Sequence, residues 1–139
     1  MTSAQSGKLS LFLSSSSGSP FYMSYTSGTT GVTNWQIAPN LTDALVADSS
    51  WHHYAFRIWQ EGTTLYSKVY RDGNYDSMSS RAIGASLGPL DTFMAGTIAT
   101  ELPSTTGTLS ASLDDFRFWK GLRSAREISR FYDQKIYAS

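Results

Sequence analysis

Two pairs of adjacent side chains are of types that could do chemistry. His52 and His53 would supply imidazoles for a metal ion or a proton transfer, and Asp114 and Asp115 would supply two carboxylates. Each pair lies in a stretch expected to be a β-strand, where successive side chains point to opposite faces. Neither pair can then act together on one ion or one bond. The chain also has no cysteine and no further histidine to complete a zinc site.

A calcium site is a separate hypothesis, placed at a predicted hairpin turn. Asp72, Asn74 and Asp76 form an Asp-x-Asn-x-Asp run that offers alternate oxygen ligands. Calcium prefers such oxygens, but the run lacks the bidentate glutamate of an EF-hand loop. A tight turn at Asp72-Gly73 is the simpler interpretation. Calcium is therefore an optional cofactor, and no other cofactor is expected.

Glycoside hydrolysis requires two carboxylates that flank one scissile bond. The glutamates of this chain stand far apart, with Glu61 in an expected turn, Glu101 in an expected loop and Glu127 in an expected helix cap. No phosphate-binding glycine loop is present either. We therefore expect a protein that is not an enzyme.

Exposed aromatic rings beside hydroxyl and amide groups could bind a glycan. The candidates are Trp35, Trp59, Tyr66, Tyr70 and Tyr75, because strand alternation turns some of these side chains outward. The alternative is that these rings pack between sheets or against a partner subunit, since aromatic side chains contribute much of the burial in cores and interfaces.

Composition excludes several classes of partner. The chain has 139 residues, the length of one domain, and its 11 basic and 11 acidic residues cancel to zero net charge. This balance provides no basic surface for nucleic acid or for an anionic membrane. No stretch approaches the ~18 apolar residues of a membrane span, and no secretory signal is visible at the start. We therefore expect no nucleic acid partner and no membrane insertion.

Alternation of apolar with small polar residues predicts antiparallel strands with a hydroxyl-rich exterior. The expected strands cover residues 9–13, 21–25, 32–37, 51–59, 64–70 and 113–119, and Tyr75 begins a return strand. Aromatic residues on both faces of 51–59 indicate a central strand. Residues 41–47 fit a short strand or a single helical turn equally well.

A short helix is predicted near the C-terminus. Ser124 and Glu127 form a capping box, in which each side chain satisfies a backbone N–H group of the other residue. Ile128, Phe131 and Tyr132 follow at helical spacing. This helix should close one end of a β-sandwich.

In this order, the segments resemble a laminin-G-like, or concanavalin-A-like, jelly-roll domain. The motifs are Trp51-His52-His53, Arg71-Asp72-Gly73, LDDFRFW at residues 113–119 and LRSAREI at residues 122–128. The resemblance is good over residues 50–132 and vague over residues 9–49. It implies an all-β fold, an antiparallel β-sandwich of the jelly-roll type with one short C-terminal helix. It also implies that Asp114 and Asp115 are structural and bind turn amides and basic groups.

The resemblance also bears on domain organisation. Residues 1–8 are expected to be a flexible arm, and residues 9–139 a single domain. Domains of this type carry opening strands well before the Trp-His-His motif, and this chain has little room for them. Because open sheet edges invite pairing, we expect other protein subunits as partners, in a homo-oligomer or in a capsid or tail assembly.

Two functional hypotheses follow from this resemblance, both by analogy of fold. The first is a non-catalytic structural, decoration or adhesion module on the exterior of an assembly such as a phage virion. The alternative is a free-standing glycan-binding, lectin-like module, assisted by calcium or independent of it, with cell-surface glycans as partners. Both place the chain on a virion or at an extracellular surface.

Overall fold

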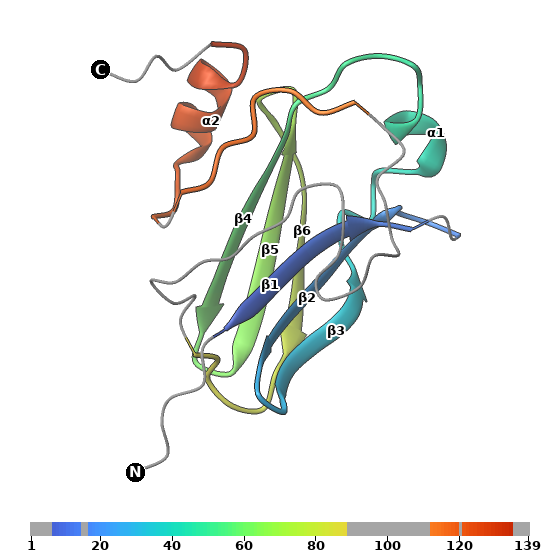
Figure 1. Cartoon of the computed structure of the whole chain (residues 1–139). Helices are drawn as coiled ribbons and strands as arrows, with labels where there is room; N and C mark the ends of the chain where they lie inside the picture. The colour runs from blue at the N-terminus through green and yellow to red at the C-terminus, as the bar shows by residue number, and fades with distance from the viewer. Residues whose placement is uncertain (1–6, 15–16, 89–111, 120, 135–139) are drawn as a thin grey trace.

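A computed structural model of the chain describes residues 7–14, 17–88, 112–119 and 121–134 (Figure 1). In this part of the chain, two antiparallel sheets have the orders β1-β2-β3 and β4-β5-β6. The elements are β1 (Lys8–Leu13), β2 (Phe21–Ser27), β3 (Thr30–Gln36), α1 (Asp43–Val46), β4 (Tyr54–Glu61), β5 (Thr64–Arg71), β6 (Asn74–Ala82) and α2 (Ala125–Phe131). The predicted all-β antiparallel sandwich with a short C-terminal helix is confirmed.

The two sheets share one core. Met23 of β2 and Leu65 of β5 are fully buried in it. The ring of Phe21 joins the sheets, because its centre lies 5.0 Å from that of Tyr54 and 5.4 Å from that of Phe56. Burial of each large apolar side chain stabilises the fold by about 1.5–3 kcal/mol. The inward sides of both sheets are therefore fixed, and the outward sides remain available for function.

The predicted turn at Asp72-Gly73 connects β5 to β6. Asp72 has a φ of 50° and Gly73 a φ of 78°, which is the geometry of a two-residue turn that matches the twist of a hairpin. A Cβ atom on Gly73 would lie 2.5 Å from Cδ1 of Tyr132. The turn thus lies directly against the end of α2, which stands beside the sheet of β4 to β6 (Figure 1).

Strand β4 differs from the prediction in two ways. It begins at Tyr54 rather than Trp51, and it lies at an edge of its described sheet, where β5 is central. Just before this start, the Asp72 carboxylate accepts a hydrogen bond of 2.9 Å from the His53 N–H group, and the His53 carbonyl accepts one of 2.8 Å from the Asp72 N–H group. The turn between β5 and β6 therefore holds the residue that precedes β4.

The prediction of a strand over residues 113–119 is wrong. These residues pair with no strand among those described. Asp115 has a φ of 54°, which interrupts an extended chain. Its carboxylate accepts a hydrogen bond of 3.0 Å from Nε of Arg117, and this guanidinium also donates to the Phe131 carbonyl at 3.0 Å. Residues 113–119 are thus held by the contact of Arg117 with Asp115 and by its contact with the end of α2.

The remaining expectations concern short segments. Residues 41–47, left open between strand and helix, contain the single turn of α1. The capping box of α2 is confirmed, with Ser124 accepting from the Glu127 N–H group at 3.2 Å and Glu127 accepting from the Ser124 N–H group at 2.7 Å. Residues 1–6 of the predicted arm lie outside the described residues, and Lys8 is the first residue of β1.

Candidate functional site

The outward side of β4, β5 and β6 gathers most of the predicted glycan-binding residues. Strand pairing places Trp59 opposite Tyr66, Arg57 opposite Lys68, and Tyr70 opposite Tyr75. Directly opposed residues of antiparallel strands share one side of the sheet. We call this surface the aromatic face, defined by Arg57, Trp59, Tyr66, Lys68, Tyr70 and Tyr75.

One half of the aromatic face is a stack of two rings and a cation. The rings of Trp59 and Tyr66 are nearly parallel, at 10°, with centres 5.2 Å apart. The guanidinium carbon of Arg57 lies 5.6 Å from the centre of the Trp59 ring, within the range of a cation–π interaction. The indole N–H of Trp59 donates to Glu61 at 3.1 Å. These contacts fix the orientation of the Trp59 ring.

The other half places an ammonium group between two tyrosines. Nζ of Lys68 lies 5.0 Å from the ring centre of Tyr75 and 6.0 Å from that of Tyr70. The two rings meet edge to face, at 72° and 6.1 Å. Arg57 links the halves, because its guanidinium donates to the Tyr70 hydroxyl at 3.4 Å.

Burial separates the predicted glycan-binding residues. Trp35 is 8% exposed and belongs to the core between the sheets, and Tyr70 is 1% exposed. Their rings cannot meet a ligand, so the structure removes both from the predicted contacts, and Tyr70 instead supports Arg57 and Tyr75. Trp59 and Tyr66 are half-buried, and Tyr75 is 57% exposed. Strand alternation predicted that some of these rings point outward, but it did not predict how deeply each ring is buried.

The three predicted calcium ligands do not converge. The two carboxylate oxygens of Asp72 bind Nδ1 of His52 at 2.7 Å and the N–H group of His53 at 2.9 Å. Asn74 donates to the Asp72 carbonyl at 3.1 Å, and Asp76 accepts from the Ser77 hydroxyl at 2.6 Å. Among the described residues, no cluster of three or more acidic, histidine or cysteine side chains could hold a metal ion. The run serves the hairpin turn instead.

His52 lies between two carboxylates. Its Nε2 is 2.8 Å from Asp48, just after α1, and its Nδ1 is 2.7 Å from Asp72 in the β5–β6 turn. Hydrogen bonds to Asp48 and then Asp72 raise the pKa of His52 above its usual value. Burial alone would raise the pKa of Asp72, but hydrogen bonds from His53 and His52 outweigh it, and the net shift is downward. This His52 cluster ties three segments together.

His53 points elsewhere, as the splayed pair predicted. Its ring packs on Tyr132, with centres 5.8 Å apart. Burial, and then the nearby charge of Arg117, lowers the pKa of His53. Its Nδ1 is buried without a hydrogen-bond partner among the described residues. The neutral ring is therefore part of the packing between β4 and the end of α2.

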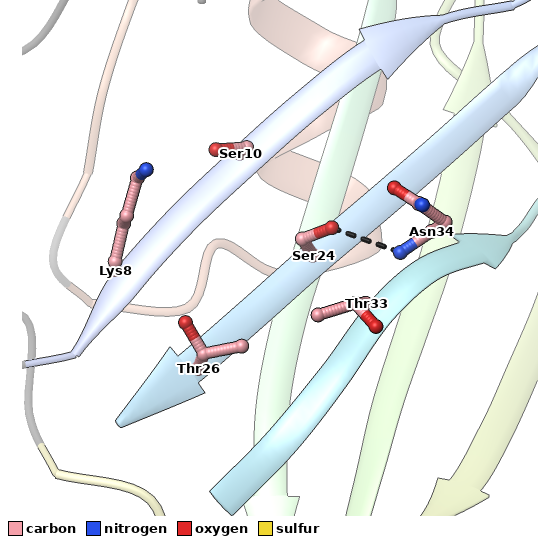
Figure 2. A pocket seen from close by; sticks show the side chains of 6 residues that line it. All are labelled: Lys8, Ser10, Ser24, Thr26, Thr33 and Asn34. Carbon is pink, nitrogen blue, oxygen red and sulfur yellow. Dashed lines mark hydrogen bonds between the residues drawn. The ribbon is translucent and has the colours of Figure 1, made fainter. Parts of the chain in front are cut away.

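The outward side of the first sheet carries a hollow, which the sequence-based reasoning missed. Side chains from β1, β2 and β3 surround a volume of about 240 Å³ (Figure 2). We call this surface the hydroxyl face, defined by Lys8, Ser10, Ser24, Thr26, Thr33 and Asn34. The backbone N–H of Asn34 donates to the Ser24 hydroxyl at 2.9 Å, where the pairing of β2 with β3 shifts register. Small outward hydroxyl residues in successive strands were the available signal.

The sequence-based reasoning also missed a Gly-x-Ser-x-Gly pattern at residues 84–88. In serine hydrolases this pattern forms a sharp turn from a strand into a helix, with a histidine beside the serine. Here no helix begins within the pattern, and both histidines are engaged at Asp48, Asp72 and Tyr132. Gln60 holds the stretch through the Leu87 N–H group at 2.9 Å. The pattern is therefore structural.

Three of the singled-out carboxylates make local structural contacts. Glu61 accepts from Trp59 at the end of β4, and Glu127 caps α2, whereas Glu101 lies outside the described residues. Of the aspartate pair, Asp115 forms an ion pair with Arg117. None of these described groups forms the paired carboxylates that a glycosidase uses.

Comparison with known proteins agrees with the fold. A laminin-G-type family model, described as the concanavalin A-like lectin/glucanases superfamily, matches residues 1–129. The chain therefore belongs to this family, and the match includes the first half, where the motifs are vague. Searches of curated proteins and of solved structures found no significant match. None of the helices in the described segments is long and apolar enough to cross a membrane.

Proposed function

We propose that this chain is a non-catalytic, lectin-like adhesion module that binds saccharides through its aromatic face. One observation supports the proposal above others: the Trp59–Tyr66 ring stack and the exposed Tyr75 lie on the same outward side of one sheet. Binding sites for small polar ligands combine apolar or aromatic surface with a few placed polar groups. The aromatic face supplies both kinds of group on rigid strands.

Membership in the family supports binding but is compatible with lectins and glucanases alike. The non-catalytic part of the proposal rests on the carboxylates. Glu61 and Glu127 are each engaged in a local contact, one with an indole and one with a helix end. A glycosidase needs two carboxyl groups within about 10 Å that both face the scissile bond. The carboxylates of Asp48 and Asp72 come close to each other, but both bind the ring of His52, which lies between them.

Placement of the module on the exterior of an assembly, such as a phage virion, remains a proposal. Its support is an apolar edge: Leu11 and Leu13 of β1 are 43% and 42% exposed, although they pair with Met23 and Phe21 on the inward side. Such an edge suits contact with another subunit. An adhesion module at an outer surface would use this edge for assembly and the aromatic face for its ligand.

The proposed function can be tested by saccharide binding. The purified chain should bind at least one member of a panel of neutral and acidic polysaccharides, measured by isothermal titration calorimetry with and without a calcium chelator. Trp59→Ala should weaken this binding at least tenfold, about 1.4 kcal/mol, because a stacked ring is lost. The chelator should change nothing, since Asp72, Asn74 and Asp76 do not converge.

Phe12→Ala is the matched control. Phe12 also stacks on a tyrosine, Tyr22, with ring centres 5.7 Å apart, but on the other sheet. The variant should retain the affinity of the wild-type chain. Absence of saccharide binding, or an equal loss in both variants, would contradict the proposed function.

A further inference from the structure

The aromatic face carries two cations side by side. Arg57 and Lys68 are directly opposed in the pairing of β4 with β5, and like charges at such positions repel each other. We propose that the ligand of this face is an acidic saccharide, whose carboxylate or sulfate group binds between Arg57 and Lys68. This inference rests on the proposed function and names the class of saccharide.

No acidic side chain neutralises this pair in the described segments. The ion pairs found there involve other basic groups, namely His52, Arg71, Arg117 and Arg123. An anionic ligand would relieve the repulsion between these two cations.

The rings hold the cations in position for such a ligand. Arg57 lies between the Trp59 ring and the Tyr70 hydroxyl, and Lys68 lies between the rings of Tyr70 and Tyr75. A guanidinium can bind a carboxylate or sulfate through two parallel hydrogen bonds, and an ammonium adds a compact charge. The exposed part of Tyr75 remains for the apolar face of a sugar ring. Charge and aromatic surface together therefore favour an acidic sugar over a neutral one.

The test compares four polymers by calorimetry at low ionic strength. Dextran is the neutral saccharide, hyaluronan carries carboxylates, dextran sulfate carries sulfates, and poly-L-glutamate carries charge without sugar. At least one acidic polysaccharide should bind tenfold or more tightly than dextran and than polyglutamate. Added salt should weaken this binding, because exposed charges are screened. The hyaluronan and dextran sulfate arms identify which acidic group is preferred.

Substitutions then locate the site. Arg57→Gln and Lys68→Gln should each weaken acidic saccharide binding at least fivefold, and Lys68→Arg should retain it. Arg126→Gln, which removes one positive charge from an exposed position of α2, is the control for net charge and should change little. Unchanged near-ultraviolet circular dichroism would establish that each variant is folded.

The outcomes separate this inference from the proposed function. If dextran binds as tightly as the acidic polysaccharides, and the glutamine variants change nothing, the acidic ligand is refuted while saccharide binding stands. If polyglutamate binds as tightly as the acidic polysaccharides, charge alone is responsible and the inference fails. If no saccharide binds at all, the proposed function fails with it.

Discussion

The outward sides of the two sheets are alike in one respect and opposite in another. Each carries a stacked pair of aromatic rings that spans two strands, Phe12–Tyr22 on the first sheet and Trp59–Tyr66 on the second. On the outward side of the first sheet, hydroxyl side chains and Lys8 surround a hollow. On the second, the Arg57 guanidinium lies near the Trp59 ring and the Lys68 ammonium lies near the Tyr75 ring. Stacked rings by themselves therefore do not define a binding site. The cations held against rings distinguish the two surfaces.

The inward edges of the sheets also differ. On β4, Tyr54, Phe56 and Ile58 pack against the shared core. On β1, Leu11 and Leu13 face the same way but remain substantially exposed. The inward side of β1 is therefore apolar and open to contact with another chain, whereas the inward side chains of β4 are half-buried.

The largest expected effect tests this difference between the edges. We predict that the chain self-associates at tens of micromolar, so that sedimentation gives at least twice the mass of the 15.3 kDa monomer. Leu11→Ser with Leu13→Ser should restore the monomer, because removal of apolar area weakens association. Phe12→Ser, on the opposite side of the same strand, should leave the mass unchanged. A wild-type chain that is monomeric at all concentrations would contradict the expected subunit partners.

A second prediction compares the two hairpin turns of the sheet β4-β5-β6. Gly62 and Gly73 both have positive φ, 57° and 78°, so alanine costs about 1 kcal/mol at either position. Only at Gly73 would the added Cβ also meet Tyr132 and Ser129 of the α2 region. Gly73→Ala should therefore lower the free energy of unfolding by about 2–3 kcal/mol in all, measured with urea. Equal losses in both variants would show that α2 does not rest on this turn.

The smallest expected effect concerns pH and compares the two histidines. The fold raises the pKa of His52. The stability that this histidine adds is therefore complete below its unfolded pKa of about 6.5, and it is lost as pH rises through the folded pKa. The fold lowers the pKa of His53. The stability that depends on its neutral ring is therefore present above about pH 6.5 and is lost as pH falls. Two adjacent residues just before β4 therefore titrate with opposite effects on stability.

Urea unfolding between pH 5.5 and 8 would measure these contributions. The stability of the wild-type chain relative to His52→Gln should be greatest at the acidic end and should decline as pH rises. Relative to His53→Gln it should change in the opposite direction. Parallel curves for the two variants would refute the roles assigned to Asp48 and Asp72.

Much of the fold was predictable because alternation and turn chemistry are local. The strands containing Leu65 and Met23, the turn at Asp72-Gly73 and the capping box at Ser124 were all found from residue types and spacing. The segment at residues 113–119 was not, because its alternation is that of a strand although Arg117 holds it to Asp115 and to α2. Pairing partners are not encoded locally.

For the candidate site, the sequence by itself determined which residues are aromatic, which are charged and which side of a strand each occupies. Those facts predicted that neither the histidine pair nor the aspartate pair acts together, on the expectation that both pairs lie in strands. The structure places both pairs outside strands, and the histidines are separated instead by the contacts of His52 with Asp48 and Asp72 and of His53 with Tyr132. Only the tertiary structure decided that Trp35 is in the core and that Tyr75 is exposed. It also decided that Arg57 lies opposite Lys68, because register joins residues distant in the chain. The charge on the aromatic face is therefore a property of strand pairing.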